Sequence, residues 1–162
     1  MDTSKKILNR DELKSTLERH RTRGKKIVLA NGCFDLLHAG HIRYLKGARA
    51  EGDILVVAVN SDSSTQSLKG PGRPVMPERG RAALVAGLSS VDFVVIFAEP
   101  NVESLLQDLR PDVHAKGTDY EPETVPERGA SARLGIRVAI VGDPKHHSTR
   151  DLLANIRKRA DG

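Results

Sequence analysis

Two histidines, His38 and His41, stand three residues apart with Gly40 between them in a short loop. The loop follows a brief apolar run, residues 26–31, and leads into a pattern typical of a helix. At the start of a helix this spacing places both imidazoles on one side, where the backbone N–H groups and the helix dipole favour an anion. The pair therefore predicts a phosphate-binding site.

Two other interpretations of these histidines stay open. Either residue alone is explained more simply as a polar residue that caps the helix. The pair also has the composition of a zinc site, but Cys33 is the only cysteine and no His-Glu-x-x-His pattern occurs. Because a helix N-terminus repels cations, we place zinc well below phosphate and expect no metal ligands in the protein.

Further loops carry side chains suited to phosphate or sugar. Lys69 and Arg73 lie in a stretch rich in glycine and proline, residues 116–120 read Lys-Gly-Thr-Asp-Tyr, and residues 147–150 read His-Ser-Thr-Arg. An aspartate can accept hydrogen bonds from ribose hydroxyls, and hydroxyls at a helix start lie beside amides that hold phosphate. Taken alone, each loop has a simpler interpretation as a solvated turn or a helix cap.

The chain alternates apolar runs with amphipathic stretches. We expect strands at residues 26–31, 53–60, 93–97, 113–115 and 136–141, and helices at 8–23, 40–51, 78–89, 102–109 and 148–159. A polar loop is expected at 61–77, and residues 116–135 have no assigned structure. This order predicts an α/β fold with a Rossmann-like, doubly wound parallel sheet of about five strands in a single domain. Ligands of such sheets bind beyond the carboxyl ends of the strands, which is where these loops lie.

Composition narrows the class of protein. The formal net charge of +5 permits nucleic-acid binding, but aromatic residues are only 3% of the 162 residues, so platforms for base stacking are scarce and we expect no nucleic-acid partner. No apolar run approaches the length of a membrane span, and the first residues lack the apolar stretch of a secretory signal. A single cysteine precludes an internal disulfide. We therefore expect a cytoplasmic protein without a membrane partner.

The loop of residues 31–41, Asn-Gly-Cys-Phe-Asp-Leu-Leu-His-Ala-Gly-His, resembles the signature of the cytidylyltransferase-like nucleotidyltransferase superfamily. Together with Leu-Lys-Gly at 68–70, Arg-Pro-Val at 73–75 and the motif at 116–120, it is similar to the adenylyltransferase domain of bacterial ADP-heptose synthesis. The similarity implies a nucleotidyltransferase domain over residues 25–162, preceded by an N-terminal helical extension over residues 1–24.

The resemblance implies an enzyme that joins ATP, with Mg²⁺, to D-glycero-β-D-manno-heptose 1-phosphate and releases pyrophosphate. The anionic acceptor oxygen attacks the α-phosphorus directly, so catalysis is positioning and charge stabilisation. The catalytic residues that it implies are His38, His41 and Lys69. The nucleotide contacts that it implies are Cys33, Phe34, Gly40, Arg81, Lys116, Asp119, Ser148 and Thr149. The contacts to the sugar phosphate that it implies are Asn31, Asp35, Asn60, Asp62 and Arg73.

Two residues depart from the family pattern, because Arg79 replaces a typical Glu and Arg150 a typical Thr. Arg81 is explained nearly as well as an exposed arginine at a helix start. Since the resembling domain is often fused to a sugar kinase, we expect a separate kinase in the same pathway, and a homodimer is compatible with the superfamily.

Three alternatives stay open. The first is cytidylyl transfer to glycerol 3-phosphate or a similar acceptor. The second is a non-catalytic module that binds nucleotides or nucleic acid. The third is an oxidoreductase, although the first strand is not followed by the Gly-x-Gly-x-x-Gly pattern that such an enzyme requires.

Overall fold

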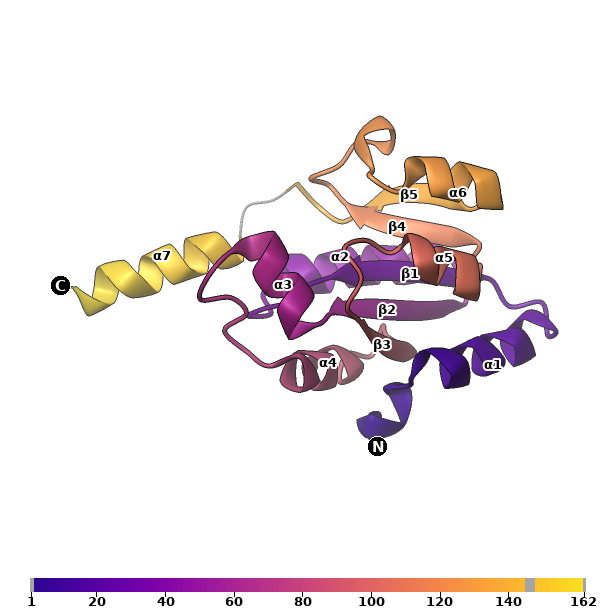
Figure 1. The fold of residues 1–162 in the computed structure, drawn as a ribbon, viewed down its shortest axis with the longest axis horizontal. Coiled ribbons are helices and arrows are strands. Elements are labelled where there is room, and N and C mark those ends of the chain that lie inside the picture. Colours follow the sequence, from indigo (N-terminus) through magenta and orange to yellow (C-terminus); the bar gives the residue numbers. More distant parts are fainter. Residues whose placement is uncertain (1, 145–147, 162) are drawn as a thin grey trace.

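Five runs of largely apolar residues form one parallel sheet in the computed structural model, which describes residues 2–144 and 148–161 (Figure 1). The strands are β1 (Ile27–Gly32), β2 (Ile54–Asn60), β3 (Phe93–Phe97), β4 (Val113–Gly117) and β5 (Arg137–Val141). Their order is β3-β2-β1-β4-β5, and all neighbouring strands are parallel. The predicted single-domain, doubly wound α/β fold is confirmed, with strand bounds within two residues of those expected.

Helices cover both faces of the sheet. They are α1 (Arg10–Arg21), α2 (Ala39–Ala50), α3 (Asp62–Lys69), α4 (Glu78–Ala86), α5 (Glu103–Leu109), α6 (Arg128–Leu134) and α7 (Thr149–Ala160), with 3-10 helices at Thr3–Lys6 and Pro122–Thr124. In Figure 1, α2 lies behind the sheet and α5 in front of it. The helices α2 and α4 bury one core against the sheet, and α1 and α5 bury a second core on the other face. Because both faces are covered, every residue of β2 is buried.

Two helices differ from the prediction. The helix α3 lies inside the expected polar loop, and α6 lies in the stretch to which the sequence assigned no structure. The side chains of α3 are mostly hydroxyls and amides, so no apolar periodicity marks it. Ser61 caps this helix by accepting a hydrogen bond from the Ser64 amide at 3.1 Å, and Ser64 and Thr65 are buried. The polar-loop prediction is therefore wrong over α3, where capping and tertiary burial stabilise the helix.

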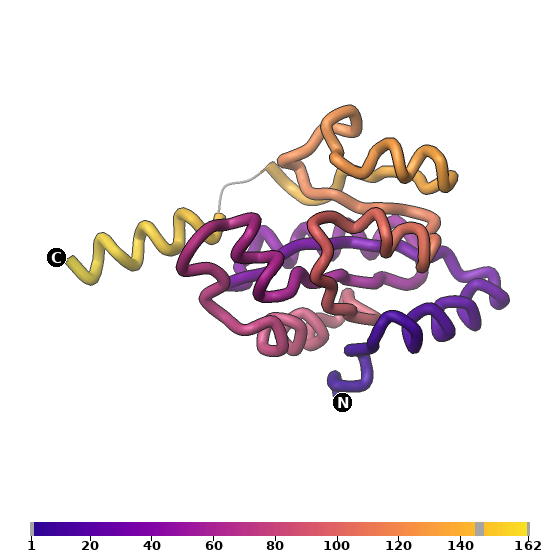
Figure 2. The backbone as a smooth tube through the Cα atoms, viewed as in Figure 1, coloured from indigo at the N-terminus to yellow at the C-terminus, as the bar shows by residue number. Residues whose placement is uncertain are grey.

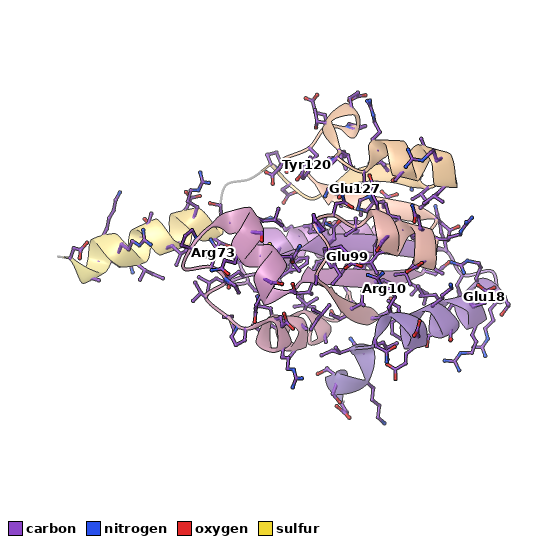
Figure 3. All side chains as sticks on the ribbon, viewed as in Figure 1. Arg10, Glu18, Arg73, Glu99, Tyr120 and Glu127 are labelled. Atoms are coloured by element: carbon purple, nitrogen blue, oxygen red, sulfur yellow. The ribbon has the colours of Figure 1, made fainter. Side chains whose placement is uncertain are left out.

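The N-terminal segment packs directly on the sheet. Leu13 and Leu17 of α1 are buried in the core that α1 shares with α5 and the sheet. Arg10 forms ion pairs with Glu99 and with Asp108, the second at 3.2 Å (Figure 3). The expected helical extension is thus part of the same packed unit as the rest of the chain.

The topology places a crevice between two strands. From β1 the chain passes through α2 to β2 on one side, whereas β3 leads through α5 to β4 on the other side of β1. The carboxyl ends of β1 and β4 therefore flank the switch point at which ligands bind in such sheets. The last helix, α7, extends away from the sheet (Figure 2). Within residues 2–144 and 148–161, no helix has the length and apolarity needed to cross a membrane.

Candidate functional site

A cavity of about 920 Å³ opens at the carboxyl ends of β1 and β4. Its walls come from the β1–α2 loop and the start of α2, the end of α3, β4 with the loop after it, the segment after β5, and α7. The volume suits a ligand of nucleotide size. The sequence-predicted residues in the lining are Asn31, Cys33, Phe34, Asp35, His38, Gly40, His41, Asn60, Lys69, Arg73, Lys116, Asp119, Ser148 and Thr149.

The two histidines stack on each other, with ring centroids 3.9 Å apart. His38 Nδ1 accepts a hydrogen bond from the Gly40 amide at 3.1 Å, and His41 Nδ1 accepts one from the His38 amide at 3.3 Å. A neutral imidazole carries one proton, so an accepting Nδ1 places that proton on Nε2. Each ring therefore caps α2 with one nitrogen and has a donor on the other. The helix dipole at this end of α2 favours an anionic partner for those donors.

Phe34 supports the histidines from the protein side. It is buried, and its φ of 51° lies in the left-handed region, which is uncommon for a residue other than glycine. Its ring lies 5.5 Å from the His41 ring and stacks on Tyr44 with centroids 6.4 Å apart. This packing holds the β1–α2 loop in the conformation that exposes the histidines to the cavity.

Asp35 joins three segments of the cavity wall. Its carboxylate accepts hydrogen bonds from Arg73 Nε at 2.8 Å and from the amides of Val75 and Met76 at 2.8 and 3.1 Å. Its carbonyl oxygen accepts one from Thr149 Oγ1 at 2.8 Å, which ties the start of α7 to this loop. Burial alone raises the pKa of Asp35, but these donors outweigh it and the pKa is lowered. Both carboxylate oxygens are engaged, so Asp35 organises the wall and positions Arg73.

Lys69 ends α3 at the rim of the cavity, where its side chain is exposed. The helix ends there because Gly70 has a φ of 93°, a conformation that favours glycine. The turn that follows brings Arg73 back to the cavity. Lys69 at the end of α3 and Arg73 in the loop that follows thus both line the cavity.

Arg81 and Asp62 are not brought to the cavity. Arg81 is fully buried and donates to the carbonyl oxygens of Met76, Cys33 and Asn60 at 2.9, 2.6 and 2.8 Å. Its remaining nitrogen donates to Asp62 Oδ1 at 2.8 Å. The sequence predicted that Arg81 contacts phosphate or is exposed at a helix start, and the structure shows neither arrangement. Arg81 lies beneath the site and joins the loops that form it.

The two asparagines at the strand ends are held differently. Asn31 Oδ1 lies 2.9 Å from Nε2 of His114, a fully buried residue of β4. Asn60 is buried, and its side-chain amide donates to Ser64 Oγ at 3.2 Å. Both line the cavity, but only Asn31 is oriented by a residue of the neighbouring strand β4.

The carboxyl end of β4 contributes Lys116 to the lining, and the loop that follows contributes Asp119 and Tyr120. Lys116 is 6% exposed, and burial lowers its pKa while the Glu127 carboxylate acts in the opposite direction. Thr118 Oγ1 donates to the Asp143 carbonyl at 2.8 Å and so connects this loop to the segment after β5.

At the start of α7, Ser148 is the capping residue. Its hydroxyl accepts from the Asp151 amide at 3.1 Å and donates to the Asp151 carboxylate at 2.8 Å. Arg150 lies in the cavity lining and is exposed. His146 and His147, for which no ligand role was expected, lie outside the described residues.

Sequence reasoning missed Arg43, Tyr44 and Arg157, which also line the cavity. Arg43 forms an ion pair with Asp143 at 3.0 Å, and the Tyr44 hydroxyl donates to the Ala115 carbonyl at 2.8 Å. The available signal for Arg43 and Tyr44 was helical spacing. They lie three residues after Gly40 and His41, and therefore on the same face of α2. Arg157 lies seven residues after Arg150, on the same face of α7.

Basic groups dominate the lining. Besides the two histidines, the described residues supply six arginines or lysines and four aspartates to it. Such an excess inside a concave surface attracts polyphosphates. In the described part of the chain, no group of three or more His, Cys, Asp or Glu side chains is arranged to hold a metal ion.

Known proteins resemble this chain over most of its length. A family model described as Cytidylyltransferase-like matches residues 29–154. The chain is 44% identical over 159 residues to the bifunctional protein HldE of Syntrophotalea carbinolica. The matched region is 98% of this chain and 32% of that protein. It is 46% identical over 153 residues to the bifunctional protein HldE of Pseudomonas aeruginosa, where the matched region is 94% of this chain and 32% of that protein. The chain thus spans about a third of the length of these relatives.

Two solved structures share the fold. The lipopolysaccharide core biosynthesis protein of Thermoplasma volcanium superposes with a TM-score of 0.65 at 28% identity, covering 75% of this chain and all of that one. Pantoate-beta-alanine ligase of Francisella tularensis superposes with a TM-score of 0.61 over 88% of this chain and 68% of its own. At 16% identity, the second likeness concerns the fold alone.

Proposed function

Since the chain belongs to the cytidylyltransferase-like family of nucleotidyltransferases, we propose that it transfers the adenylyl group of ATP to the phosphate of a sugar 1-phosphate and releases pyrophosphate. The acceptor that we propose is D-glycero-β-D-manno-heptose 1-phosphate, which gives ADP-heptose for lipopolysaccharide synthesis. Support comes from the motifs of the cavity loops, from the HldE relatives and from the likeness to a lipopolysaccharide core biosynthesis protein.

One observation carries the proposal. The Nδ1 atoms of two stacked imidazoles accept hydrogen bonds from backbone amides, so their N–H donors are on Nε2. The two rings lie at the start of a helix, in a basic cavity of about 920 Å³. Donors fixed in this way stabilise negative charge without reorganising during the reaction. Polyphosphate is the ligand chemistry that matches them.

The reaction that we propose uses the acceptor itself as nucleophile. A phosphate oxygen of the sugar 1-phosphate forms a bond to the α-phosphorus of ATP, and the bond from that phosphorus to the oxygen bridging to the β-phosphorus breaks. The electron pair leaves with pyrophosphate. Because the attacking oxygen is already anionic, the protein supplies orientation and charge stabilisation.

Each wall of the cavity then has a role. His38 and His41 donate to the nucleotide phosphates, and Lys69 and Arg73 neutralise phosphate from the rim. Lys116 and Asp119 face the nucleotide, with Asp119 accepting from ribose hydroxyls. The start of α7, with Ser148 and Thr149, offers further amide and hydroxyl donors. Asn31 and Asn60 contact the acceptor from the strand ends.

Magnesium fits this site only when it is bound to the nucleotide. Among the described residues, no group of three or more His, Cys, Asp or Glu side chains could hold a metal ion. The carboxylates of Asp35, Asp143 and Asp151 are engaged by Arg73, Arg43 and Ser148. We therefore propose that nucleotide phosphates and water hold Mg²⁺, as is usual for this ion. No protein residue is assigned to it.

The wider context is also proposed. We place the protein in the cytoplasm, where ATP and sugar phosphates are available, with a sugar kinase supplying the acceptor and with two copies able to form a homodimer. Since the chain spans about a third of its HldE relatives, their second activity is not assigned to it.

The experiment is a panel of ATP, CTP, GTP and UTP against heptose 1-phosphate, glucose 1-phosphate and glycerol 3-phosphate, with pyrophosphate release and product mass as readouts. We expect ATP with heptose 1-phosphate to give the highest kcat/KM. A preference for CTP with glycerol 3-phosphate, the runner-up favoured by the family's description, would replace the proposal. Nucleotide binding without pyrophosphate release would indicate a non-catalytic module.

A further inference from the structure

Glu127 is a buried acid that the proposed reaction does not use. It is 4% exposed and precedes α6, yet its side chain makes no hydrogen bond that caps this helix. It is also absent from the cavity lining. A buried carboxylate without a capping role requires a partner, because burial penalises its charge.

The cation that faces Glu127 is Lys116. Its Nζ lies 3.8 Å from Glu127 Oε2, and the two side chains are 8% and 5% exposed. The same Nζ lies 4.5 Å from the centroid of the Tyr120 ring. Figure 3 labels Tyr120 and Glu127 in the part of the molecule formed by β4, β5 and α6. Lys116 and Tyr120 line the cavity, so the ammonium lies between an acid behind it and the nucleotide cavity in front.

The geometry of this pair is poor for stability. At 3.8 Å the two groups are too far apart for a hydrogen bond, and Glu127 Oε2 has no hydrogen-bond partner among the described residues. Buried ion pairs stabilise a fold only when their geometry is good and their remaining atoms are satisfied. An imperfect ion pair beside a cavity is better explained by its effect on the charge of Lys116, the residue that faces the ligand.

We propose that Glu127 is a positioning residue that keeps the Lys116 ammonium charged and directed, against the Tyr120 ring, toward the phosphates of a nucleotide in the cavity. The inference rests on the proposed function for the identity of that ligand. When the nucleotide binds, its phosphates contact the side of the Lys116 ammonium that faces away from Glu127. The carboxylate therefore acts through Lys116 and touches no reacting atom.

The groups around Lys116 determine its protonation. Glu127 approaches from the start of α6 and Tyr120 from the loop after β4, with Asp119 beside it. His114, on the same strand, is buried and neutral, and the Tyr44 hydroxyl of α2 stays protonated because burial raises its pKa. Burial lowers the pKa of Lys116, and Glu127 is the charge that offsets this. Removal of the carboxylate should therefore release the Lys116 proton at a lower pH.

The test uses Glu127→Gln, which keeps the shape and removes the charge, with Glu123→Gln at an exposed acid as the matched control. The first measurement is the NMR titration of the Lys116 ε-methylene group, which needs no ligand. We expect its pKa to fall by about one unit or more in Glu127→Gln. The second is the affinity for ATP across a range of pH, without acceptor. We expect binding about tenfold weaker, with its alkaline loss moved to lower pH.

Two further variants cover the case in which Glu127→Gln does not fold. Glu127→Asp retains the charge, so its affinity for ATP should fall at high pH (the alkaline limb of the profile) much as that of the wild type does. Lys116→Arg carries a guanidinium that does not deprotonate, so its ATP binding should lose the alkaline limb. An unchanged Lys116 titration in Glu127→Gln, or a wild-type alkaline limb in Lys116→Arg, overturns the inference. A wild-type protein that binds no ATP while Lys116 titrates as expected contradicts the proposed function and supports the role of Glu127.

Discussion

The imidazole Nε2 of His114 on β4 lies 2.9 Å from the side-chain oxygen of Asn31 on β1, so a side-chain hydrogen bond joins the two strands that flank the cavity. His114 Nδ1 is buried and has no hydrogen-bond partner among the described residues. A proton there would be a buried donor without an acceptor, which costs more than an unused lone pair. Nε2 therefore carries the proton and donates to the side-chain oxygen of Asn31.

This arrangement makes stability depend on pH. Burial, with a smaller contribution from the Lys116 charge, lowers the pKa of His114 from 6.5 to about 3. Between these values the unfolded chain binds a proton that the folded protein excludes. We expect the free energy of unfolding to fall as pH decreases from about 6.5 toward 3, by up to about 1.4 kcal/mol per pH unit. Urea unfolding of the wild type and His114→Leu between about pH 5 and 6.5 measures the difference in slope.

The control for this prediction is His20→Leu, a half-buried histidine of α1 outside the cavity, which should leave the slope attributed to His114 in place. The lowered pKa of Asp35 also makes acid destabilising, but only as pH falls below about 4, through its folded-state value. Equal slopes for the wild type and His114→Leu would mean that His114 does not titrate as the buried site requires.

His41→Ala should nearly abolish adenylyl transfer, and His38→Ala should behave similarly. Loss of a donor that stabilises charge in the transition state costs about 2–4 kcal/mol, or roughly 30- to 1,000-fold in kcat. Each change also removes an Nδ1 that caps α2, so we expect stability to fall by only about 1 kcal/mol. Steady-state kinetics and thermal unfolding separate the two effects. Full activity in either variant would remove that histidine from the phosphate site.

Lys69→Ala should lower turnover and leave the fold intact, because Lys69 is exposed at the rim of the cavity and ends a helix that Gly70 terminates on its own. The matched control is Lys46→Ala, an exposed lysine of α2 outside the lining. Both variants should unfold within about 0.5 kcal/mol of the wild type. If Lys69→Ala and Lys46→Ala had the same kcat, the side chain of Lys69 would be solvated and without effect on transfer.

Arg81→Met should destabilise the fold strongly. The guanidinium is fully buried and bonds three carbonyl oxygens that would each lose a donor, at about 1–3 kcal/mol for each buried group. We expect a loss of at least about 3 kcal/mol in the free energy of unfolding, or no folded protein. Arg79→Ala, at an exposed position of the same helix, should change it by less than about 0.5 kcal/mol. Denaturant unfolding measures both, and a well-folded Arg81→Met would contradict the structural role.

The sequence by itself determined the strands and the position of the site. A run such as Ile54-Leu55-Val56-Val57-Ala58-Val59 is stable only when both of its faces are buried, which is the condition inside a parallel sheet. Alternation with helices then predicted a parallel, doubly wound sheet, and it placed the loop with His38 and His41 at the carboxyl ends of the strands. These features follow from contacts between residues near in sequence, or from a pattern that repeats along the chain.

Tertiary structure alone decided which polar residues are buried and with what partners. Nothing local distinguishes Arg81 from an exposed arginine, because its acceptors come from two loops and from the end of β2. His114 and Asn31 are 83 residues apart and meet only because β4 returns beside β1. Glu127 and Lys116 are eleven residues apart in the sequence, and they meet because the chain turns back between β4 and α6. The physical reason is that burying a polar group is penalised until a partner is supplied, and the partner belongs to the fold rather than to the neighbouring sequence.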